Sequence, residues 1–367
     1  MGTIFYGMSG EGRGHATRVR TVVENLKDEH DIFLFAPFHA YDLLSNAYKD
    51  TNVHVINIRG LNFYYSRGRL SYFKTCREGT RYLLNWRKLA SELDEYVEQY
   101  SPDLVITDFE PSLPRAARRH NIPFVSLDHQ HFLVVSDLSG LPGWLYNKTR
   151  TMSYIVKKYY SGQADTIVSS FYFPPLKPEF SDVIQAGVML RPEVISAKQS
   201  HGDHLLCYIR RFASENILRT LRSCNRDVYI YGLGEKEQDG NLLYRPISID
   251  GFLHDLATCH ALICNAGNQL VGEAIYLKKP VLAMPEALNF EQYINAHYLQ
   301  ASGAGDWCRT DDFSPEVLQR FLDRAEDFRG NSYPERVNGN TVILDALRKH
   351  LPVSRTSGKE PVLLNAY

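Results

Sequence analysis

The first fifteen residues decide the fold, because Thr3–Tyr6 (TIFY) runs directly into Gly7–His15 (GMSGEGRGH). The TIFY run is apolar without alternation, which is typical of a strand buried on both faces of a parallel sheet. The four glycines of the second run let the backbone approach a ligand closely, and the following helix presents free N–H groups. Ligands of doubly wound folds bind at the carboxyl ends of strands, so this stretch predicts an α/β domain with a ligand-binding loop.

Strand-like and helix-like segments alternate along the rest of the chain in two series. The first series predicts strands at Asp31–Ala36, Val53–Ile58, Leu104–Thr107, Phe124–Leu127 and Thr166–Ser169, with helices at Arg13–Lys27, Tyr72–Tyr100 and Trp144–Tyr160. The second predicts strands at Leu205–Ile209, Val228–Tyr231, Ala261–Cys264 and Val281–Met284, with helices at Ala213–Ser223, Asn268–Leu277, Glu291–Ala301 and Pro315–Phe328. This alternation implies right-handed βαβ units and a parallel sheet in each series.

A polar, non-periodic stretch, Arg191–Asp203, separates the two series. We therefore predict two Rossmann-like domains with a cleft between them, an N-terminal one over residues 1–195 and a C-terminal one over residues 203–334. A last helix-like run, Thr341–His350, follows them. We expect residues 335–367 to pack back on the N-terminal domain.

Composition supports a two-domain globular protein and excludes several classes. The 367 residues are 44% hydrophobic and 23% charged, which is a globular composition. The formal net charge of −1 gives no overall attraction to nucleic acid, so we expect no nucleic-acid partner. No apolar run reaches the roughly 20 residues that span a bilayer, and the early strand leaves no room for a signal peptide. Six cysteines without a CxxC pair suggest reduced thiols and a cytoplasmic protein.

The glycine-rich loop ends in His15, which we predict as a catalytic residue. A dinucleotide fingerprint is the alternative for the loop, but its third glycine is replaced by His15 and no acidic residue ends the second strand. His15 falls in the first helical turn, where the helix dipole favours a neutral imidazole that can accept a proton. The other interpretation is an ordinary helix-start residue. Gly12 and Gly14 are expected to lie against the ligand.

Two further strand ends of the first series carry polar side chains. Asp108 follows a buried strand and can orient one nitrogen of His15, or it can cap the helix that starts near Pro111. His129 and His131 follow the next strand and can line the same cleft. A metal site at these two histidines is the weaker alternative, because the spacing offers no third ligand.

The second series contains a turn suited to a phosphate. Asn265-Ala266-Gly267-Asn268 lies between a strand and a helix, where backbone N–H groups point toward an anion. Glu273 comes nearly two helical turns later and can bind a ribose diol, or it can be a solvated carboxylate. Glu291 and Gln292 stand side by side after the next strand and can bind sugar hydroxyls.

Together these segments resemble the GT-B glycosyltransferases, especially the UDP-glucuronosyltransferase-like and peptidoglycan N-acetylglucosaminyltransferase groups. The likeness is strongest over Asn265–Gly305, which holds the small-residue turn, Glu273, the proline-bounded strand Lys279–Pro285 and the EQYINA run that begins at Glu291. The glycine-rich loop that ends in His15 is the second match. Two departures concern the diphosphate: many relatives have His-Gly-Gly where this chain has Asn265-Ala266-Gly267, and a usually glycine- and serine-rich loop here contains Arg211.

The resemblance implies a role for each matching residue. His15 would deprotonate an acceptor hydroxyl held by the N-terminal domain, Asp108 would orient His15, and His129 would line the acceptor site. The remaining residues would bind the donor, with the diphosphate on the Asn265–Asn268 turn and the glycine-rich loop, the ribose on Glu273, and the sugar on Glu291 and Gln292. Arg211 would clamp the phosphate, with an ordinary surface arginine as the alternative.

The implied activity is an inverting, metal-independent transfer of a sugar from a nucleotide-diphosphate donor, expected to be a UDP-sugar, to an acceptor hydroxyl. The donor is a substrate, so no cofactor is expected. Val281 stands where many retaining GT-B enzymes carry a second glutamate, which favours inversion. Two rival functions share the fold: a UDP-sugar 2-epimerase and a catalytically silent sugar-nucleotide-binding protein.

The acceptor is expected to be a small molecule, a glycan or a lipid-linked molecule. Residues 59–88 mix aromatic and basic side chains, a pattern that allows an acceptor pocket, contact with an anionic membrane surface, or a solvated helix face. Peripheral membrane contact is therefore one prediction among three.

Overall fold

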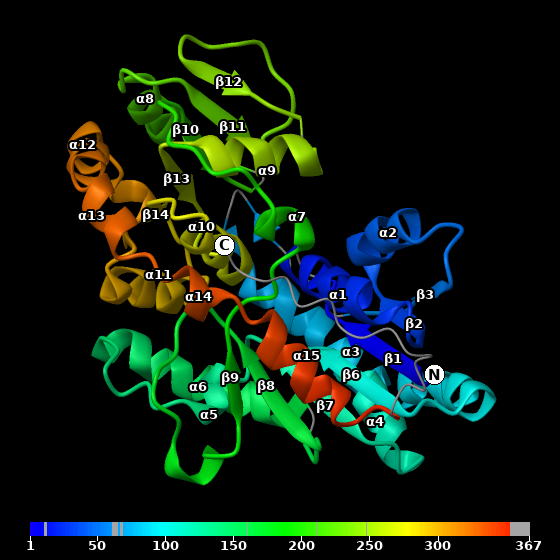
Figure 1. Ribbon diagram of the computed structural model, residues 1–367. Coiled ribbons are helices and arrows are strands. Elements are labelled where there is room, and N and C mark those ends of the chain that lie inside the picture. Colours follow the sequence, from blue (N-terminus) through cyan, green and yellow to red (C-terminus); the bar gives the residue numbers. More distant parts are fainter. Residues whose placement is uncertain are drawn as a thin grey trace.

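The computed structural model describes residues 1–10, 13–60, 65–66, 69–159, 161–210, 212–246 and 248–352. It consists of two lobes, each built on a parallel sheet with helices on both faces (Figure 1). This architecture confirms the predicted α/β class.

The N-terminal sheet has seven parallel strands in the order β3-β2-β1-β6-β7-β8-β9. Their bounds are β1 Thr3–Met8, β2 Asp31–Ala36, β3 Val53–Asn57, β6 Leu104–Asp108, β7 Phe124–Asp128, β8 Asp165–Ser169 and β9 Ile184–Ala186. The chain order reverses between β1 and β6, and ligands of such sheets bind at this switch point. Met8 pairs in register with Asp108 there, so the glycine-rich loop and the end of β6 lie next to each other.

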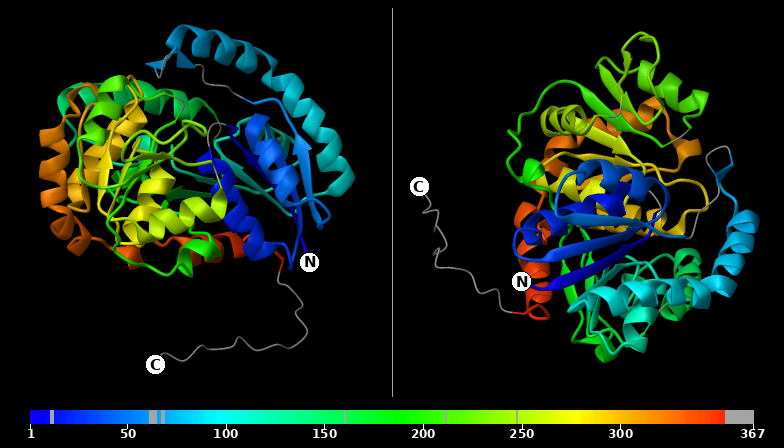
Figure 2. Two further views of the ribbon diagram at one scale, coloured as in Figure 1. Left: turned by 90° about the horizontal axis from the view of Figure 1, so that it is seen from above. Right: turned by 90° about the vertical axis from the view of Figure 1, so that its right-hand side faces the viewer.

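Helices and a small hairpin accompany this sheet between its strands. The helices are α1 Arg13–Leu26, α2 Phe38–Ala47, α3 Tyr72–Tyr100, α4 Ser112–Arg119, α5 Phe132–Val135 and α6 Gly143–Tyr159, and the hairpin is β4 Tyr65–Ser66 with β5 Arg69–Leu70. Figure 2 shows α3 as a long helix along the outside of the lobe. Its second half buries Leu89, Ala90, Leu93 and Val97, so that half anchors the helix.

The C-terminal sheet has six parallel strands in the order β12-β11-β10-β13-β14-β15. Their bounds are β10 Leu205–Tyr208, β11 Val228–Tyr231, β12 Leu242–Tyr244, β13 Ala261–Cys264, β14 Val281–Ala283 and β15 Gly305–Trp307. The helices are α8 Glu215–Arg222, α9 Ile249–Thr258, α10 Asn268–Tyr276, α11 Phe290–Ser302, α12 Pro315–Asp323 and α13 Ala325–Gly330. The switch point between β10 and β13 places the Asn265–Asn268 turn at the ligand-binding edge.

The chain crosses between the lobes twice. The outward crossing contains α7 (Pro192–Ile195), and the return contains α14 (Pro334–Val337) and leads into α15 (Asn340–Arg348). Ile343 and Leu347 of α15 are buried in the same apolar cluster as Ile4 and Val22 of the N-terminal lobe. The last described helix therefore packs on the N-terminal lobe, across the front of Figure 1.

The structure differs from the sequence expectation in short or broken elements. The strands β9, β12 and β15 have only three residues each, so periodicity has too little length to mark them. The run expected as one helix over Pro315–Phe328 divides into α12 and α13 at Arg324, whose backbone (φ −103°, ψ 7°) is not helical.

Candidate active site

His15 and Asp108 lie in contact at the carboxyl edge of the N-terminal sheet. Nδ1 of His15 is 2.9 Å from Oδ1 of Asp108, and the Asp108 side chain is fully buried. Parallel pairing of β1 with β6 produces this contact, because it sets the start of α1 beside the end of β6. The Nδ1 approach does not have hydrogen-bond geometry, and Oδ2 of Asp108 has no partner among the described residues. With Nδ1 facing Asp108, Nε2 is the ring nitrogen left for a substrate.

A buried arginine, Arg18, also contacts this pair, and the sequence analysis did not identify it. Its Nη1 donates to Oδ1 of Asp108 at 2.7 Å, so His15 and Arg18 contact the same carboxylate oxygen. The three-residue spacing on α1 was the available signal, since residues three apart lie on one helix face. Tyr6 of β1 is buried nearby, and its hydroxyl has no partner among the described residues. Burial, and next the charge of Asp108, raise the pKa of Tyr6.

Capping of α4 is performed by Glu110 and not by Asp108. The Glu110 carboxylate accepts from the backbone N–H groups of Ser112 at 2.7 Å and Leu113 at 2.8 Å. Tyr82 of α3 donates to the same carboxylate at 3.2 Å. Burial raises the pKa of Glu110, and these hydrogen bonds oppose that effect. The capping alternative for Asp108 therefore does not apply, and its carboxylate remains directed at His15 and Arg18.

The start of α1 faces the start of α10 across the two lobes. A Cβ added to Gly14 would lie 3.7 Å from Cβ of Gln269, in the first turn of α10. Gly267 precedes that turn, and a Cβ added to it would meet no atom of the described residues within 4 Å, so these residues leave open space at the N-terminus of α10. His15 on one lobe and the phosphate-type turn on the other thus border one interlobe region.

The turn before α10 is held by side-chain amides. Asn265 accepts from the N–H of Arg210 at 3.1 Å and donates to the carbonyl of Met284 at 3.1 Å, which ties three strand ends together. Asn268 donates to the Ser169 carbonyl at 3.0 Å and accepts from the N–H of Phe171 at 3.2 Å. Both amides therefore fix backbone, and Asn268 does so across the lobes.

Glu273 is buried and faces the interlobe linker. It pairs with Arg191 at 3.3 Å and accepts from the side chain of Gln269 at 3.1 Å. Gln269 in turn donates to the Met189 carbonyl at 2.7 Å. The sequence alternative of a solvated carboxylate is thus wrong, and Arg191 is a partner that the sequence analysis placed only in the domain boundary.

Glu291 and Gln292 occupy the first turn of α11 but have different surroundings. Gln292 accepts from the N–H of Glu286 at 2.7 Å and donates to its carboxylate at 3.2 Å, and Arg210 pairs with the same carboxylate at 3.1 Å. Glu291 is only partly buried, 3.5 Å from the side-chain nitrogen of Gln130. Gly12 and Arg211 lie outside the described residues.

Asn295 joins the two lobes close to His129. Its Oδ1 accepts from the Tyr172 hydroxyl at 2.9 Å and lies 3.1 Å from Nε2 of His129, and its Nδ2 donates to the Ala266 carbonyl at 2.9 Å. His129 is fully buried, which lowers its pKa, and its Nδ1 has no partner among the described residues. His131 instead contacts Asp128 at 2.7 Å, so the two histidines have separate partners.

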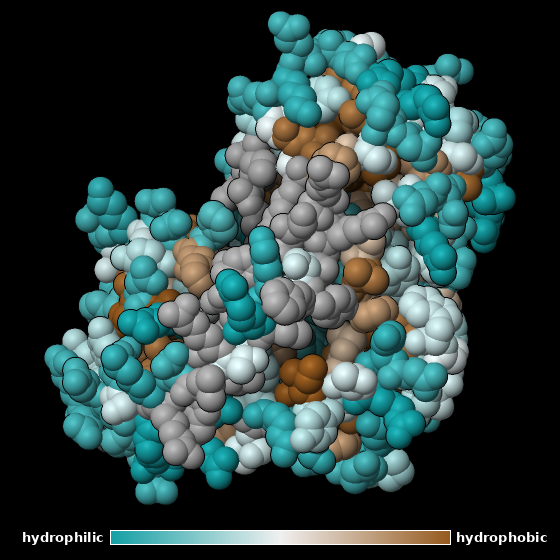
Figure 3. Space-filling view, turned by 180° about the vertical axis from the view of Figure 1, so that it is seen from behind, coloured by the Kyte–Doolittle hydropathy of each residue, from teal (hydrophilic) through white to brown (hydrophobic). Residues whose placement is uncertain are grey.

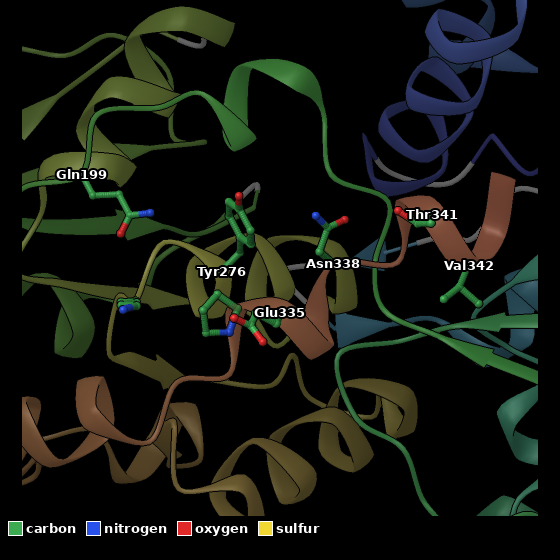
Figure 4. A pocket seen from close by; sticks show the side chains of 8 residues that line it. Gln199, Tyr276, Glu335, Asn338, Thr341 and Val342 are labelled. Carbon is green, nitrogen blue, oxygen red and sulfur yellow. The ribbon is translucent and has the colours of Figure 1, made fainter. Parts of the chain in front are cut away.

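A separate hollow of about 500 Å³ lies away from these residues (Figure 4). The end of α10, the linker, α14 and the start of α15 form it. Tyr276, Glu335 and Asn338 are among the residues that line it. None of the predicted site residues lines it. The face viewed from behind carries mostly hydrophilic side chains at its margins, with separated hydrophobic patches (Figure 3). Within the described ranges, no helix combines the length and apolarity needed to cross a bilayer.

Known structures share this two-lobed arrangement. MurG of Acinetobacter baumannii is 17% identical, with 95% of this chain and 100% of that chain covered and a TM-score of 0.63. The calicheamicin glycosyltransferase CalG4 is 16% identical, with 95% and 98% covered and a TM-score of 0.65. LpCGTa in complex with UDP is 16% identical, with 95% and 99% covered and a TM-score of 0.66. These likenesses show the fold, which is GT-B as predicted, and no curated protein sequence matches the chain.

The sequence itself supplies the family. The profile that describes glycosyl transferase family 1 matches residues 2–325, which is most of the chain. The fold, with its two sheets facing one interlobe region, is the one expected of such an enzyme. This chain therefore belongs to glycosyl transferase family 1, and its activity is the transfer of a glycosyl group.

Proposed function

We propose that the chain is an inverting glycosyltransferase that moves a sugar from a nucleotide-diphosphate donor to an acceptor hydroxyl, with His15 as the base. The observation that carries this proposal is the contact between His15 and a buried Asp108, opposite the open turn at Gly267. A hydroxyl has a pKa far above neutrality, so it needs a base as it attacks. A carboxylate beside an imidazole stabilises the imidazolium that forms.

The donor diphosphate is assigned to the Asn265–Asn268 turn and the N-terminus of α10. Backbone N–H groups at a helix N-terminus favour an anion. Hydrogen bonds of the Asn265 and Asn268 side chains already hold this turn in place. The related LpCGTa structure contains UDP, and that of VinC contains dTDP, so both hold a pyrimidine nucleoside diphosphate. We propose UDP-sugar as the donor, with Glu273 at the ribose and with Glu291 and Gln292 at the sugar.

The reaction then proceeds as one displacement. The acceptor oxygen attacks the anomeric carbon while its proton passes to Nε2 of His15, since Nδ1 faces Asp108. The bond from the anomeric carbon to the diphosphate oxygen breaks, and the electron pair leaves with the diphosphate. The turn N–H groups and Arg210 or Arg211 compensate the leaving charge. Attack from the face opposite the leaving group inverts the anomeric configuration.

For the acceptor, helix α6 favours a lipid-linked molecule at a membrane surface. This helix contains no acidic residue, and it exposes large apolar side chains at Trp144, Tyr154 and Ile155 among the cations Lys148, Arg150, Lys157 and Lys158. Exposed aromatic groups flanked by cations suit an anionic lipid interface. Sedimentation with anionic vesicles tests this, and binding that persists in K157E/K158E or equals binding to neutral vesicles would contradict it. The aromatic and basic stretch at 59–88 falls partly outside the described residues.

The base is tested by H15Q, with H39Q as the matched control because His39 is exposed on α2. A thermal-shift screen of nucleotide sugars first identifies the donor. H15Q should then lower transfer about 100-fold or more, because that is the usual contribution of a general base. Donor affinity by calorimetry should stay within about threefold. Transfer within tenfold of wild type would remove His15 as the base.

The same preparation separates the rival functions. Conversion of UDP-N-acetylglucosamine without any acceptor, followed by NMR, would identify an epimerase. Donor binding with neither transfer nor hydrolysis would identify a silent binding protein. Either result would contradict the proposed transfer mechanism.

A further inference from the structure

A buried guanidinium contacts the same carboxylate oxygen as the proposed base. Nη1 of Arg18 lies 2.7 Å from Oδ1 of Asp108, and Nδ1 of His15 lies 2.9 Å from the same atom. The side chains of Arg18 and Asp108 are 4% and 0% exposed, so solvent screens their charges weakly. Nε of Arg18 has no partner among the described residues. Among the described residues, this guanidinium contacts the carboxylate that also faces His15.

Arg18 changes the net charge of the group of side chains to which a proton on His15 is added. In a simple pair of histidine and aspartate, protonation takes the pair from −1 to 0, and the carboxylate holds the proton firmly. With Arg18 included, protonation takes the group from 0 to +1. A cation in contact with the same carboxylate oxygen opposes the formation of the imidazolium on His15.

We propose that Arg18 is a positioning residue that offsets the charge of Asp108, so that this carboxylate holds a proton on His15 less firmly than an isolated carboxylate would. Asp108 still orients the ring, but without the full charge of an isolated carboxylate. A base that is already protonated cannot act, so the arginine raises the fraction of competent enzyme. This inference rests on the proposed function for its purpose, although the charge effect itself does not require catalysis.

Other ionisable groups surround the three residues. Tyr6 comes from β1, Asp128 and His129 come from the end of β7, and Glu291 comes from α11. The charges of Arg18 and Asp128 act on the pKa of Tyr6, and those of Glu291, Arg18 and Asp128 act on the pKa of His129, which burial lowers. Among the described side chains, Arg18 is thus a buried cation that offsets these carboxylates.

The test follows His15 directly by NMR in protein labelled at histidine Cε1, with its resonance assigned by its loss in H15Q. In R18M, which keeps the length of the side chain, half-protonation of His15 should occur about one pH unit or more higher than in wild type. In R18K, which keeps the charge, it should stay within about half a unit of wild type. The acid limb of the transfer rate should move in the same direction as the NMR midpoint in R18M.

A double variant guards against misfolding, because R18M leaves a buried carboxylate unpaired. D108N/R18M removes both charges, and its midpoint should lie above that of D108N. An unmoved midpoint in R18M and in this double variant would overturn the inference, as would equal shifts in R18K and R18M. If H15Q retains transfer while R18M moves the midpoint, the proposed function fails and the charge effect stands.

Discussion

The two lobes present different chemistry to the region between them. On the N-terminal lobe, His15, Arg18 and Asp108 are ionisable and leave several polar atoms without partners among the described residues. On the C-terminal lobe, Asn265 and Asn268 are neutral amides bonded to backbone on both sides. A proton acceptor must change its charge during reaction, whereas a diphosphate site works best when its dipoles are already fixed. This difference supports the proposal that the N-terminal lobe transfers the proton and the C-terminal lobe binds the donor.

The largest expected effect comes from removing the charge of the N-terminal pair. D108N keeps the shape of the side chain but cannot stabilise the imidazolium, so kcat should fall by about 100- to 10,000-fold. Donor affinity should change little, because the C-terminal lobe is untouched. D94N is the matched control, since Asp94 forms an ion pair with Arg119 on the outer helices. Steady-state kinetics measure kcat, and a loss below threefold in D108N would contradict the proposal that the N-terminal lobe transfers the proton.

Asn295 belongs to the amide-rich lobe but reaches the other one, so N295A tests how firmly the two are joined. It removes the acceptor of the Tyr172 hydroxyl and the donor to Ala266, which leaves buried polar groups unpaired. The free energy of unfolding should fall by about 1–3 kcal/mol, and KM for the donor should rise. Urea unfolding measures this, with N52A as the exposed control. Equal stability of the two variants would show that the bridge contributes nothing.

Glu273, on the C-terminal lobe, already forms an ion pair with Arg191. A test must therefore separate its proposed role at the ribose from its role in this ion pair. E273Q should weaken UDP affinity about tenfold by calorimetry, since a ribose diol donates more strongly to a carboxylate than to an amide. R191Q removes the ion-pair partner of Glu273 and leaves the carboxylate in place. If R191Q and E273Q weaken UDP binding equally, Glu273 acts only through its ion pair, and the ribose assignment fails.

The sequence predicted which strand ends carry the site residues better than it predicted the contacts that those residues make. Asp108 and His15 follow strands that parallel pairing must bring together, so their neighbourhood could be inferred from order alone. The contact of Arg18 depends on which face of α1 turns toward β6, and a helix start fixes that only to within a residue or two. Arg191 lies in a linker without periodicity, so nothing local marked it as the partner of a residue 82 positions away.

The smallest expected effect concerns His129, a buried histidine that reaches across to the side-chain amide of Asn295 in the C-terminal lobe. Burial lowers its pKa, so the unfolded chain protonates it near pH 6.5 while the folded chain does so only at lower pH. Acid therefore favours the unfolded state, and wild type loses this contribution as the pH falls below 6.5. H129Q cannot protonate, so the stability difference between the two proteins should shrink on acidification, by about 1 kcal/mol. Buried His30 and half-buried His260, whose pKa values are also lowered, titrate alike in both proteins and cancel in the comparison. An equal stability difference between the two proteins at pH 8 and pH 5 would show that His129 takes up its proton alike in the folded and unfolded chain, and that the interlobe contact does not sense pH.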